Sequence, residues 1–243
     1  MIVSHRHRFI FVKTIKTGGT SLEIALSKFC GPEDVITPIS RDDEETRRGL
    51  GFRGPQHYRQ GFAECVSRQG LVRGLYRGVQ GNLPPRFYNH ISAPEIRALV
   101  GERTWSDYRT FTVVRNPYDR AISFYYHEKK LAGERGDFPS FADFLRKHAS
   151  HLHANWEKYT ERGAVLVDDL VRYEELGPDL ASLSERLGLP ENVHDVMKSI
   201  SAKGSFRPST AGDRYSLLDD ESVGLLSLLC KPEIDLLGYR VPR

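Results

Sequence analysis

Residues 9–26, FIFVKTIKTGGTSLEIAL, pass from an apolar segment through a loop with two glycines into an amphipathic segment. Phe9 to Lys13 has the composition of a buried strand. After the loop Thr14 to Gly19, apolar residues recur at helical spacing, and Thr20 and Glu23 are spaced as in a capping box. The sequence therefore predicts a strand, a short loop and a helix that begins at Thr20.

The loop Lys16–Ser21 has the features of an anion site. Its two glycines let the backbone approach a ligand closely. The start of the following helix offers unpaired N–H groups and the positive end of a dipole, which favour phosphate or sulfate. Lys16 adds a mobile charge, and Thr20 and Ser21 add hydroxyl groups. The nucleoside-triphosphate pattern GxxxxGK[ST] is absent from the sequence. The simpler alternative is a plain strand–turn–helix with Lys16 in solvent.

Strand and helix patterns alternate through the rest of the chain. Further strands are predicted at 87–90, 110–114 and 169–173, and further helices at 92–100, 118–130, 138–148, 176–187 and 219–229. This alternation indicates an α/β fold. We expect a single domain, residues 1–243, whose central, mainly parallel sheet is flanked by helices. An irregular, arginine-rich insertion occupies about residues 33–85.

A second anion-binding pattern is VVRNPYDRAIS, residues 113–123. Arg115 directly follows a predicted strand, and its planar guanidinium can bind a phosphate through two hydrogen bonds. Ser123 lies on the same face of the next helix as Asp119. Because ligands bind at the carboxyl ends of parallel strands, we expect Arg115 and Ser123 near the first loop. For Arg120, a surface pair with Asp119 is an equally good interpretation.

KTIKTGGTSLE (13–23) and TFTVVRNPYDRAISFYYH (110–127) together resemble two motifs of the sulfotransferases that use 3′-phosphoadenosine 5′-phosphosulfate (PAPS). The first is similar to their 5′-phosphosulfate loop and the second to their 3′-phosphate motif. LVRYEEL (170–176) and IDLLGYRV (234–241) are similar to later stretches of the family. The likeness is greatest to the carbohydrate group, including heparan-sulfate 2-O- and 6-O-sulfotransferases. Residues 33–85 are unmatched.

The resemblance implies a P-loop-kinase-like sulfotransferase fold and a role for each matched residue. Arg115 and Ser123 would hold the 3′-phosphate, and Lys16 would stabilise the bridging oxygen as 3′,5′-phosphoadenosine leaves. In a late polar loop, Lys203 and Arg207 would contact the 3′-phosphate or adenine. The residues implied around the 5′-phosphosulfate are Lys16, Thr17, Gly18, Gly19, Thr20 and Ser21. Lys16 and backbone dipoles would supply the positive field, so we expect no metal.

His90 is the candidate general base. It follows a predicted strand, precedes a helix with a capping box at Ser92–Glu95, and is a residue type that titrates near physiological pH. A histidine in a comparable stretch of the carbohydrate sulfotransferases is thought to serve as the base. A structural role for His90 is the alternative, and the rival bases are His57, His127, His148, His151 and His153.

Composition narrows the class of protein further. The net charge of +3 is too small to indicate a nucleic-acid binder. No apolar run approaches the ~20 residues of a membrane-spanning helix. Three cysteines, Cys30, Cys65 and Cys230, suggest buried thiols in a reducing compartment. We therefore expect a cytoplasmic, soluble enzyme of bacterial type.

The acceptor remains open at this stage. The arginine-rich insertion would suit an anionic glycan, and solvated arginines give the same pattern. A peptide tyrosine, a lipid-linked sugar or a small metabolite is also compatible with the sequence. Two alternative functions are an ATP-dependent small-molecule kinase and a nucleotide-binding module that has lost catalysis.

Overall fold

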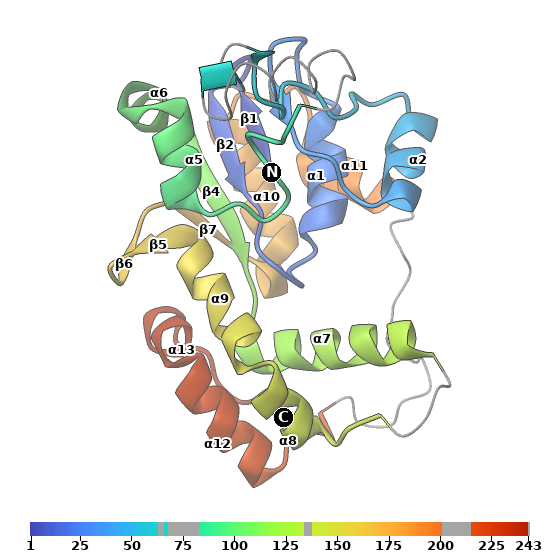
Figure 1. Cartoon of the computed structure of the whole chain (residues 1–243), viewed down its shortest axis with the longest axis vertical. Coiled ribbons are helices and arrows are strands. Elements are labelled where there is room, and N and C mark those ends of the chain that lie inside the picture. The colour runs from blue at the N-terminus through green and yellow to red at the C-terminus, as the bar shows by residue number, and fades with distance from the viewer. Residues whose placement is uncertain (63–65, 68–82, 134–137, 201–214, 243) are drawn as a thin grey trace.

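The central sheet has five strands in the order β3-β1-β2-β4-β7 (Figure 1). The computed structural model describes residues 1–62, 66–67, 83–133, 138–200 and 215–242. The strands are β1 (Ile2–Ser4), β2 (Phe9–Val12), β3 (Val35–Ile36), β4 (Arg109–Val114) and β7 (Asp169–Arg172). β2, β4 and β7 run parallel, whereas β1 is antiparallel to both β2 and β3. The predicted α/β class is confirmed.

The strand β1 makes the sheet mixed, because it runs antiparallel to both of its neighbours. Only His5 to Arg8 join β1 to β2. A connection this short joins antiparallel neighbours, because parallel strands need a long crossover. Arg8 adopts a left-handed backbone, φ 52°, within this connection. The N-terminal segment therefore forms a hairpin rather than one strand.

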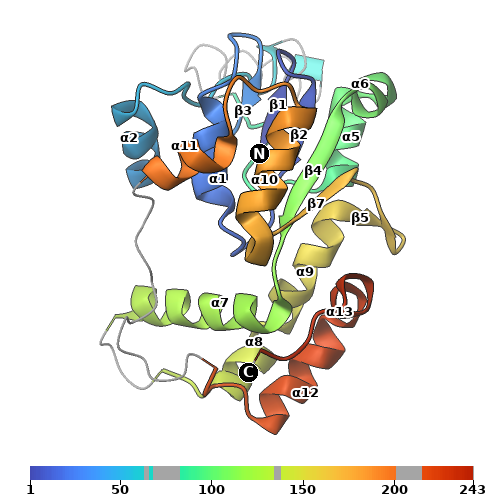
Figure 2. The same cartoon turned by 180° about the vertical axis from the view of Figure 1, so that it is seen from behind.

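Alternating side chains of the strands build two cores, one on each face of the sheet. Phe9 and Phe11 of β2 face α1 (Gly19–Ser27), α10 (Leu176–Arg186) and α11 (Val193–Ser199). Ile10 and Val12 face α5 (Ala93–Val100), α6 (Glu102–Asp107) and α9 (Ala149–Tyr159). Figure 2 shows α1, α10 and α11 in front of the sheet. α2 (Arg41–Gly49) packs beside α1 and lies within the predicted insertion.

A group of helices lies beyond the carboxyl ends of the parallel strands (Figure 1). It contains α7 (Pro117–Ala132), α8 (Phe141–Lys147), α12 (Asp220–Leu229) and α13 (Lys231–Leu237), which share a third apolar core with part of α9. A two-stranded ribbon, β5 (Thr160–Glu161) and β6 (Ala164–Val165), follows α9. In the part of the chain described, no helix is long and apolar enough to cross a membrane.

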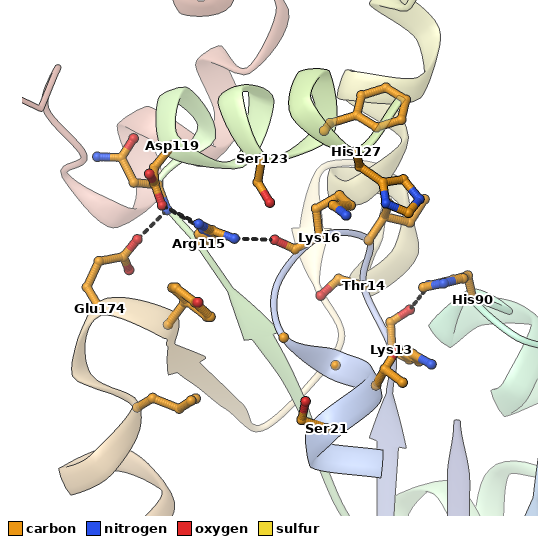
Figure 3. A pocket seen from close by; sticks show the side chains of 18 of the residues that line it. Lys13, Thr14, Lys16, Ser21, His90, Arg115, Asp119, Ser123, His127 and Glu174 are labelled. Carbon is orange, nitrogen blue, oxygen red and sulfur yellow. Dashed lines mark hydrogen bonds and ion pairs between the residues drawn. The ribbon is translucent and has the colours of Figure 1, made fainter. Parts of the chain in front are cut away.

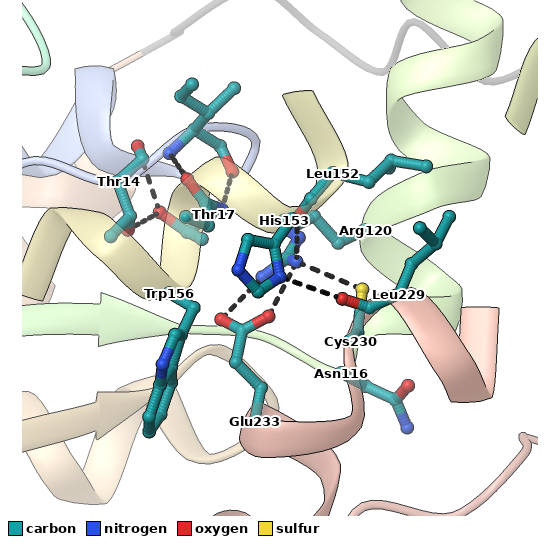
Figure 4. Close-up of polar contacts among 12 residues, drawn as sticks. Thr14, Thr17, Asn116, Arg120, Leu152, His153, Trp156, Leu229, Cys230 and Glu233 are labelled. Carbon is teal, nitrogen blue, oxygen red and sulfur yellow. Dashed lines mark hydrogen bonds and ion pairs between the residues drawn. The ribbon is translucent and has the colours of Figure 1, made fainter. Parts of the chain in front are cut away.

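A buried ion pair joins α7 to α13 (Figure 4). Arg120 donates from both terminal nitrogens to the Glu233 carboxylate, at 2.8 and 2.6 Å, and also to the Leu152 carbonyl at 3.0 Å. Tyr159 Oη donates to Glu233 at 3.2 Å. The surface pair of Arg120 with Asp119 is therefore wrong, because Arg120 points into the helical group and Asp119 pairs elsewhere.

Two local predictions are corrected by tertiary packing. The first helix is capped by Gly18 and has no side-chain cap bond, so Thr20 and Glu23 form no capping box. Glu23 points into the protein and pairs with Lys13 instead. Residues 87–90 form turns rather than a strand. The capping box of Ser92 and Glu95 is present at the start of α5.

Candidate functional site

A cavity of about 1190 Å³ lies where the carboxyl ends of β2, β4 and β7 face α7 (Figure 3). Three segments far apart in the sequence meet there: the β2–α1 loop, the β4–α7 segment and the turn before α5. The predicted site residues that line the cavity are Lys16, Gly18, Gly19, Thr20, Ser21, His90, Arg115 and Ser123. The convergence expected from the strand ends is therefore present in the structure.

The β2–α1 loop is built on tight backbone packing. Lys16 and Gly18 both have left-handed backbones, with φ 60° and 76°. A Cβ on Gly18 would lie 3.1 Å from Tyr173 Cε2, and a Cβ on Gly19 would lie 3.0 Å from Lys13 Cγ. Position 18 favours glycine because a side chain there would strain the left-handed backbone and would crowd the Tyr173 ring. The loop delivers the first N–H groups of α1 to the cavity.

Thr17 differs from its neighbours in the loop because its side chain points inward. It is 1% exposed, and its Oγ1 lies 2.9 Å from Thr14 Oγ1. Thr14 in turn donates to the Val113 carbonyl of β4 at 2.5 Å. The two hydroxyls thus tie the loop to the sheet, and Thr14, rather than Thr17, lines the cavity.

Arg115 is 6% exposed and its guanidinium is held on three sides. Nε and one terminal nitrogen donate to Asp119 Oδ2, at 2.7 and 2.5 Å. The other terminal nitrogen donates to the Lys16 carbonyl at 2.9 Å. The ring of Tyr173 lies under the guanidinium, 4.1 Å from its carbon to the ring centroid. The Arg115 cation is therefore fixed against the β2–α1 loop.

α7 presents a face to the cavity from its first turn to its third. Asn116 caps the helix by accepting from the Tyr118 N–H at 3.1 Å. Asp119, Ser123 and His127 then follow at intervals of four residues, and all line the cavity. In Figure 3, Arg115 and Asp119 lie on one side of Lys16, and His90 and His127 lie on the other.

His90 is held in one tautomer by the end of β2. Its Nδ1 lies 3.1 Å from the Lys13 carbonyl, which can only accept, so Nδ1 carries the proton and Nε2 is the acceptor. The pKa of His90 is lowered to about 4, mainly because the ring is buried and also because the charge of Lys13 lies nearby. The imidazole is therefore neutral at physiological pH. Its backbone is left-handed, with φ 60°.

Lys13 is a cavity residue that sequence reasoning missed, because it was assigned only to the end of a strand. It is 2% exposed, and its Nζ lies 2.8 Å from Glu23 Oε2. Burial acts to raise the pKa of Glu23, but the Met1 amine, Lys13 and Arg47 together lower it to about 2. Glu23 thus stays ionised and holds Lys13 behind the loop.

The other histidines considered as the base differ in whether they line the cavity. His127 and His151 line the cavity with His90. His57 lines a second cavity of about 440 Å³, and His148 packs against Phe124 and Phe144. His153 Nδ1 bonds to the Leu229 carbonyl. The predicted nucleotide contacts Lys203 and Arg207, and also Cys65, lie outside the described residues. Cys30 and Cys230 are free thiols and buried.

Four residues that line the cavity were not predicted as site residues, although Tyr173 and Glu174 belong to the LVRYEEL stretch. Tyr173 and Glu174 come from the short 3-10 helix η1 (Tyr173–Glu175) after β7, Asp43 comes from α2, and Met197 comes from α11. Only the fold brings them to the ends of β2 and β4. No group of three or more His, Cys, Asp or Glu side chains suited to a metal ion is found among the described residues.

One family model matches almost the whole chain. Residues 1–239 match the sulfotransferase family. The crystal structure of mouse sulfotransferase SULT7A1 complexed with PAP superposes with a TM-score of 0.50 and 16% identity, covering 95% of this chain and 85% of that one. At this identity the likeness shows the fold. An uncharacterized protein of Archaeoglobus fulgidus is 30% identical over 115 residues, which is 46% of this chain and 93% of the relative.

Proposed function

The chain belongs to the sulfotransferase family, and we propose that its cavity binds PAPS and transfers the sulfuryl group to a hydroxyl, with His90 as the base. The protein is an enzyme of sulfuryl transfer. The observation that carries it is the meeting of the Lys16–Ser21 loop, Arg115 with Ser123, and His90 at one cavity. The mouse structural relative is itself complexed with PAP.

The loop Lys16–Ser21 would hold the 5′-phosphosulfate. The N–H groups at the start of α1 and the side chains of Thr20 and Ser21, which line the cavity, would bind its oxygens. Lys16 would neutralise the charge that develops on the bridging oxygen as 3′,5′-phosphoadenosine leaves. Thr17 belongs to this set through its backbone, because its hydroxyl is engaged with Thr14.

Arg115 and Ser123 would bind the 3′-phosphate from the other side of Lys16. Both line the cavity, one directly after β4 and the other two turns into α7. A phosphate there would compete with Asp119 for the guanidinium, since Asp119 Oδ2 accepts from two of its nitrogens. Lys203 and Arg207 are retained in the proposal as nucleotide contacts on the strength of the family resemblance alone.

His90 would take the proton of the acceptor hydroxyl. The Lys13 carbonyl keeps its Nδ1 protonated, so Nε2 is available to accept. The acceptor oxygen forms a bond to sulfur while the bond from sulfur to the 5′-phosphate oxygen breaks, and the acceptor proton passes to Nε2. His127 and His151 are the alternatives for this role, because they line the same cavity.

A carbohydrate is the acceptor we propose, on the likeness of the two motifs to the carbohydrate sulfotransferases. A bacterial-type enzyme in the cytoplasm fits the buried free thiols Cys30 and Cys230, which suit a reducing compartment. Metal-independent catalysis is part of the same proposal, with Lys16 and the α1 dipole as the source of positive field.

The test is transfer of radiolabelled sulfate from PAPS to a panel of acceptors with EDTA present. The panel holds a desulfated glycosaminoglycan, a tyrosine peptide and a simple phenol. We expect labelled glycan. Label on the peptide or phenol alone would overturn the carbohydrate acceptor and keep the donor. Phosphoryl transfer from ATP–Mg²⁺ in its place would favour a kinase, and nucleotide binding without transfer would favour a non-catalytic module.

A further inference from the structure

We propose that Arg115 positions the β2–α1 loop, and through it Lys16, independently of any contact with the 3′-phosphate. The proposal rests on the proposed function for its catalytic meaning. It makes Arg115 a positioning residue for the 5′ end of the donor as well as a ligand for the 3′ end. The two ends of the donor site would then be mechanically coupled through one side chain.

The first observation is the hydrogen bond from Arg115 to the Lys16 carbonyl, 2.9 Å long and part-buried. It joins the end of β4 to the middle of the β2–α1 loop. Lys16 has a left-handed backbone with φ 60°, which costs a non-glycine residue of order 1 kcal/mol and persists where neighbours hold it. The Arg115 bond lies at this residue, so it helps to maintain the conformation that aims the Lys16 side chain.

The second observation is the stack that links Arg115 to Gly18. Tyr173 lies 4.1 Å below the guanidinium carbon, measured to its ring centroid, and its edge lies against Gly18. A cation over an aromatic face is attracted to it. Arg115 therefore supports the loop at two points, directly at Lys16 and through Tyr173 at Gly18.

The third observation is that Asp119 orients the guanidinium for this task. Two of the three guanidinium nitrogens donate to Asp119 Oδ2, and the third is left pointing at Lys16. The planar fork fixes these directions together, which a lysine could not do. Asp119 of α7 therefore sets the direction in which the Arg115 guanidinium points toward the loop.

Ser123 provides a matched control. It lines the cavity from α7 and is assigned to the same 3′-phosphate. Within the described part of the chain, the side chains from outside the loop that hydrogen-bond to its backbone are those of Arg115 and Asn155, and Ser123 is not among them. In the proposal, Ser123 binds only the 3′-phosphate, whereas Arg115 binds the 3′-phosphate and also positions the loop.

The experiment compares Arg115→Ala with Ser123→Ala using PAPS and adenosine 5′-phosphosulfate, which lacks the 3′-phosphate. Both variants should lose kcat/KM with PAPS. With the shorter donor, Arg115→Ala should be ~10-fold slower than Ser123→Ala, because misplacing a catalytic group costs rate whatever the donor. Equal rates of the two variants with the shorter donor would overturn the inference. Absence of any transfer from PAPS by the unmodified enzyme would instead overturn the proposed function.

Hydrogen–deuterium exchange of the peptide 13–22, measured without nucleotide, tests the contact itself. We expect faster exchange in Arg115→Ala and unchanged exchange in Ser123→Ala. Arg115→Lys serves as a second variant that keeps a cation beside Asp119, and it should also exchange faster because it loses the fork. Unchanged exchange in both Arg115 variants would overturn the inference, even if transfer from the shorter donor is too slow to measure.

Discussion

At the scale of single residues, the Lys13 carbonyl determines which ring nitrogen of His90 carries the proton. That carbonyl fixes the protonated nitrogen, and burial keeps the ring neutral. His57 offers a close structural match, with a left-handed backbone of φ 52° and a ring nitrogen 2.8 Å from the Pro32 carbonyl, but it lies outside the large cavity. His57 is therefore a matched control for the proposed role of His90.

We expect His90→Asn to lose at least ~100-fold in kcat, the scale on which a general base contributes. Asparagine tolerates the left-handed backbone at φ 60°, so the turn should survive. Binding of 3′,5′-phosphoadenosine should stay within about twofold, because the base does not touch it in the proposed mechanism. His57→Asn is the control and should keep full turnover. Near-normal turnover of His90→Asn would transfer the role of base to His127 or His151.

The protonation of His90 can be followed directly by NMR titration of the ring. Because burial and Lys13 lower its pKa to about 4, the ring should stay neutral as the pH falls from 8 to 5 and gain its proton only near pH 4. An unperturbed histidine would titrate near ~6.5. His90→Asn assigns the signal by its loss. A midpoint at the unperturbed value would contradict the burial of the neutral ring.

At the scale of elements, local signals predicted the parts of the site that local chemistry determines. The Ser92–Glu95 capping box was predicted correctly because both of its residues lie within one helical turn. Gly18 and Gly19 marked the loop for the same reason. The capping box predicted for Thr20 and Glu23 was wrong because Glu23 pairs with Lys13, which is ten residues away in the sequence and reaches it only where the strand packs against the helix.

Contacts between distant elements were outside the reach of a single sequence. Tyr173 reaches Gly18 only after β7 takes its place beside β4. The turn at His90 was predicted as a strand because Phe87 and Tyr88 favour extended structure in isolation. His90 lines the cavity although the strand predicted before it is absent, and its role as the base stays a prediction.

The start of α1 gives a prediction with an internal control. Gly18→Ala should destabilise the protein by ~1–2 kcal/mol, because φ 76° disfavours a side chain and Tyr173 lies 3.1 Å from the new Cβ. Gly224→Ala, inside α12 with nothing within 4 Å of its Cβ, should stabilise by ~0.5–1 kcal/mol. Urea unfolding measures both, and a neutral Gly18→Ala would mean that the loop can relax.

At the scale of the whole molecule, the cavity lies between the sheet and the helical group, so both sides must keep their relative position. The Arg120–Glu233 pair holds α7 against α13 within that group. α7 carries Asp119, Ser123 and His127 to the cavity wall. The ion pair therefore helps to keep α7 in place at the cavity, although Arg120 itself does not line the cavity.

Arg120→Met should cost ~3–5 kcal/mol of unfolding free energy, because Glu233 would be left buried without a cation. The double variant Arg120→Met with Glu233→Met should lose clearly less than the sum of the single variants, since it removes both charges. Denaturant unfolding followed by circular dichroism measures the cycle. Additive losses would show that the pair is not coupled.

The central claim is that this cavity recognises a nucleotide by its 3′-phosphate, and calorimetric titration tests it most directly. The purified protein is titrated with 3′,5′-phosphoadenosine, with AMP and with ATP–Mg²⁺, and the first titration is repeated with Arg115→Ala. We expect tight, metal-independent binding of 3′,5′-phosphoadenosine, weaker binding of AMP, and loss of the preference in Arg115→Ala. A preference for ATP–Mg²⁺, or equal affinity for 3′,5′-phosphoadenosine and AMP, would contradict it.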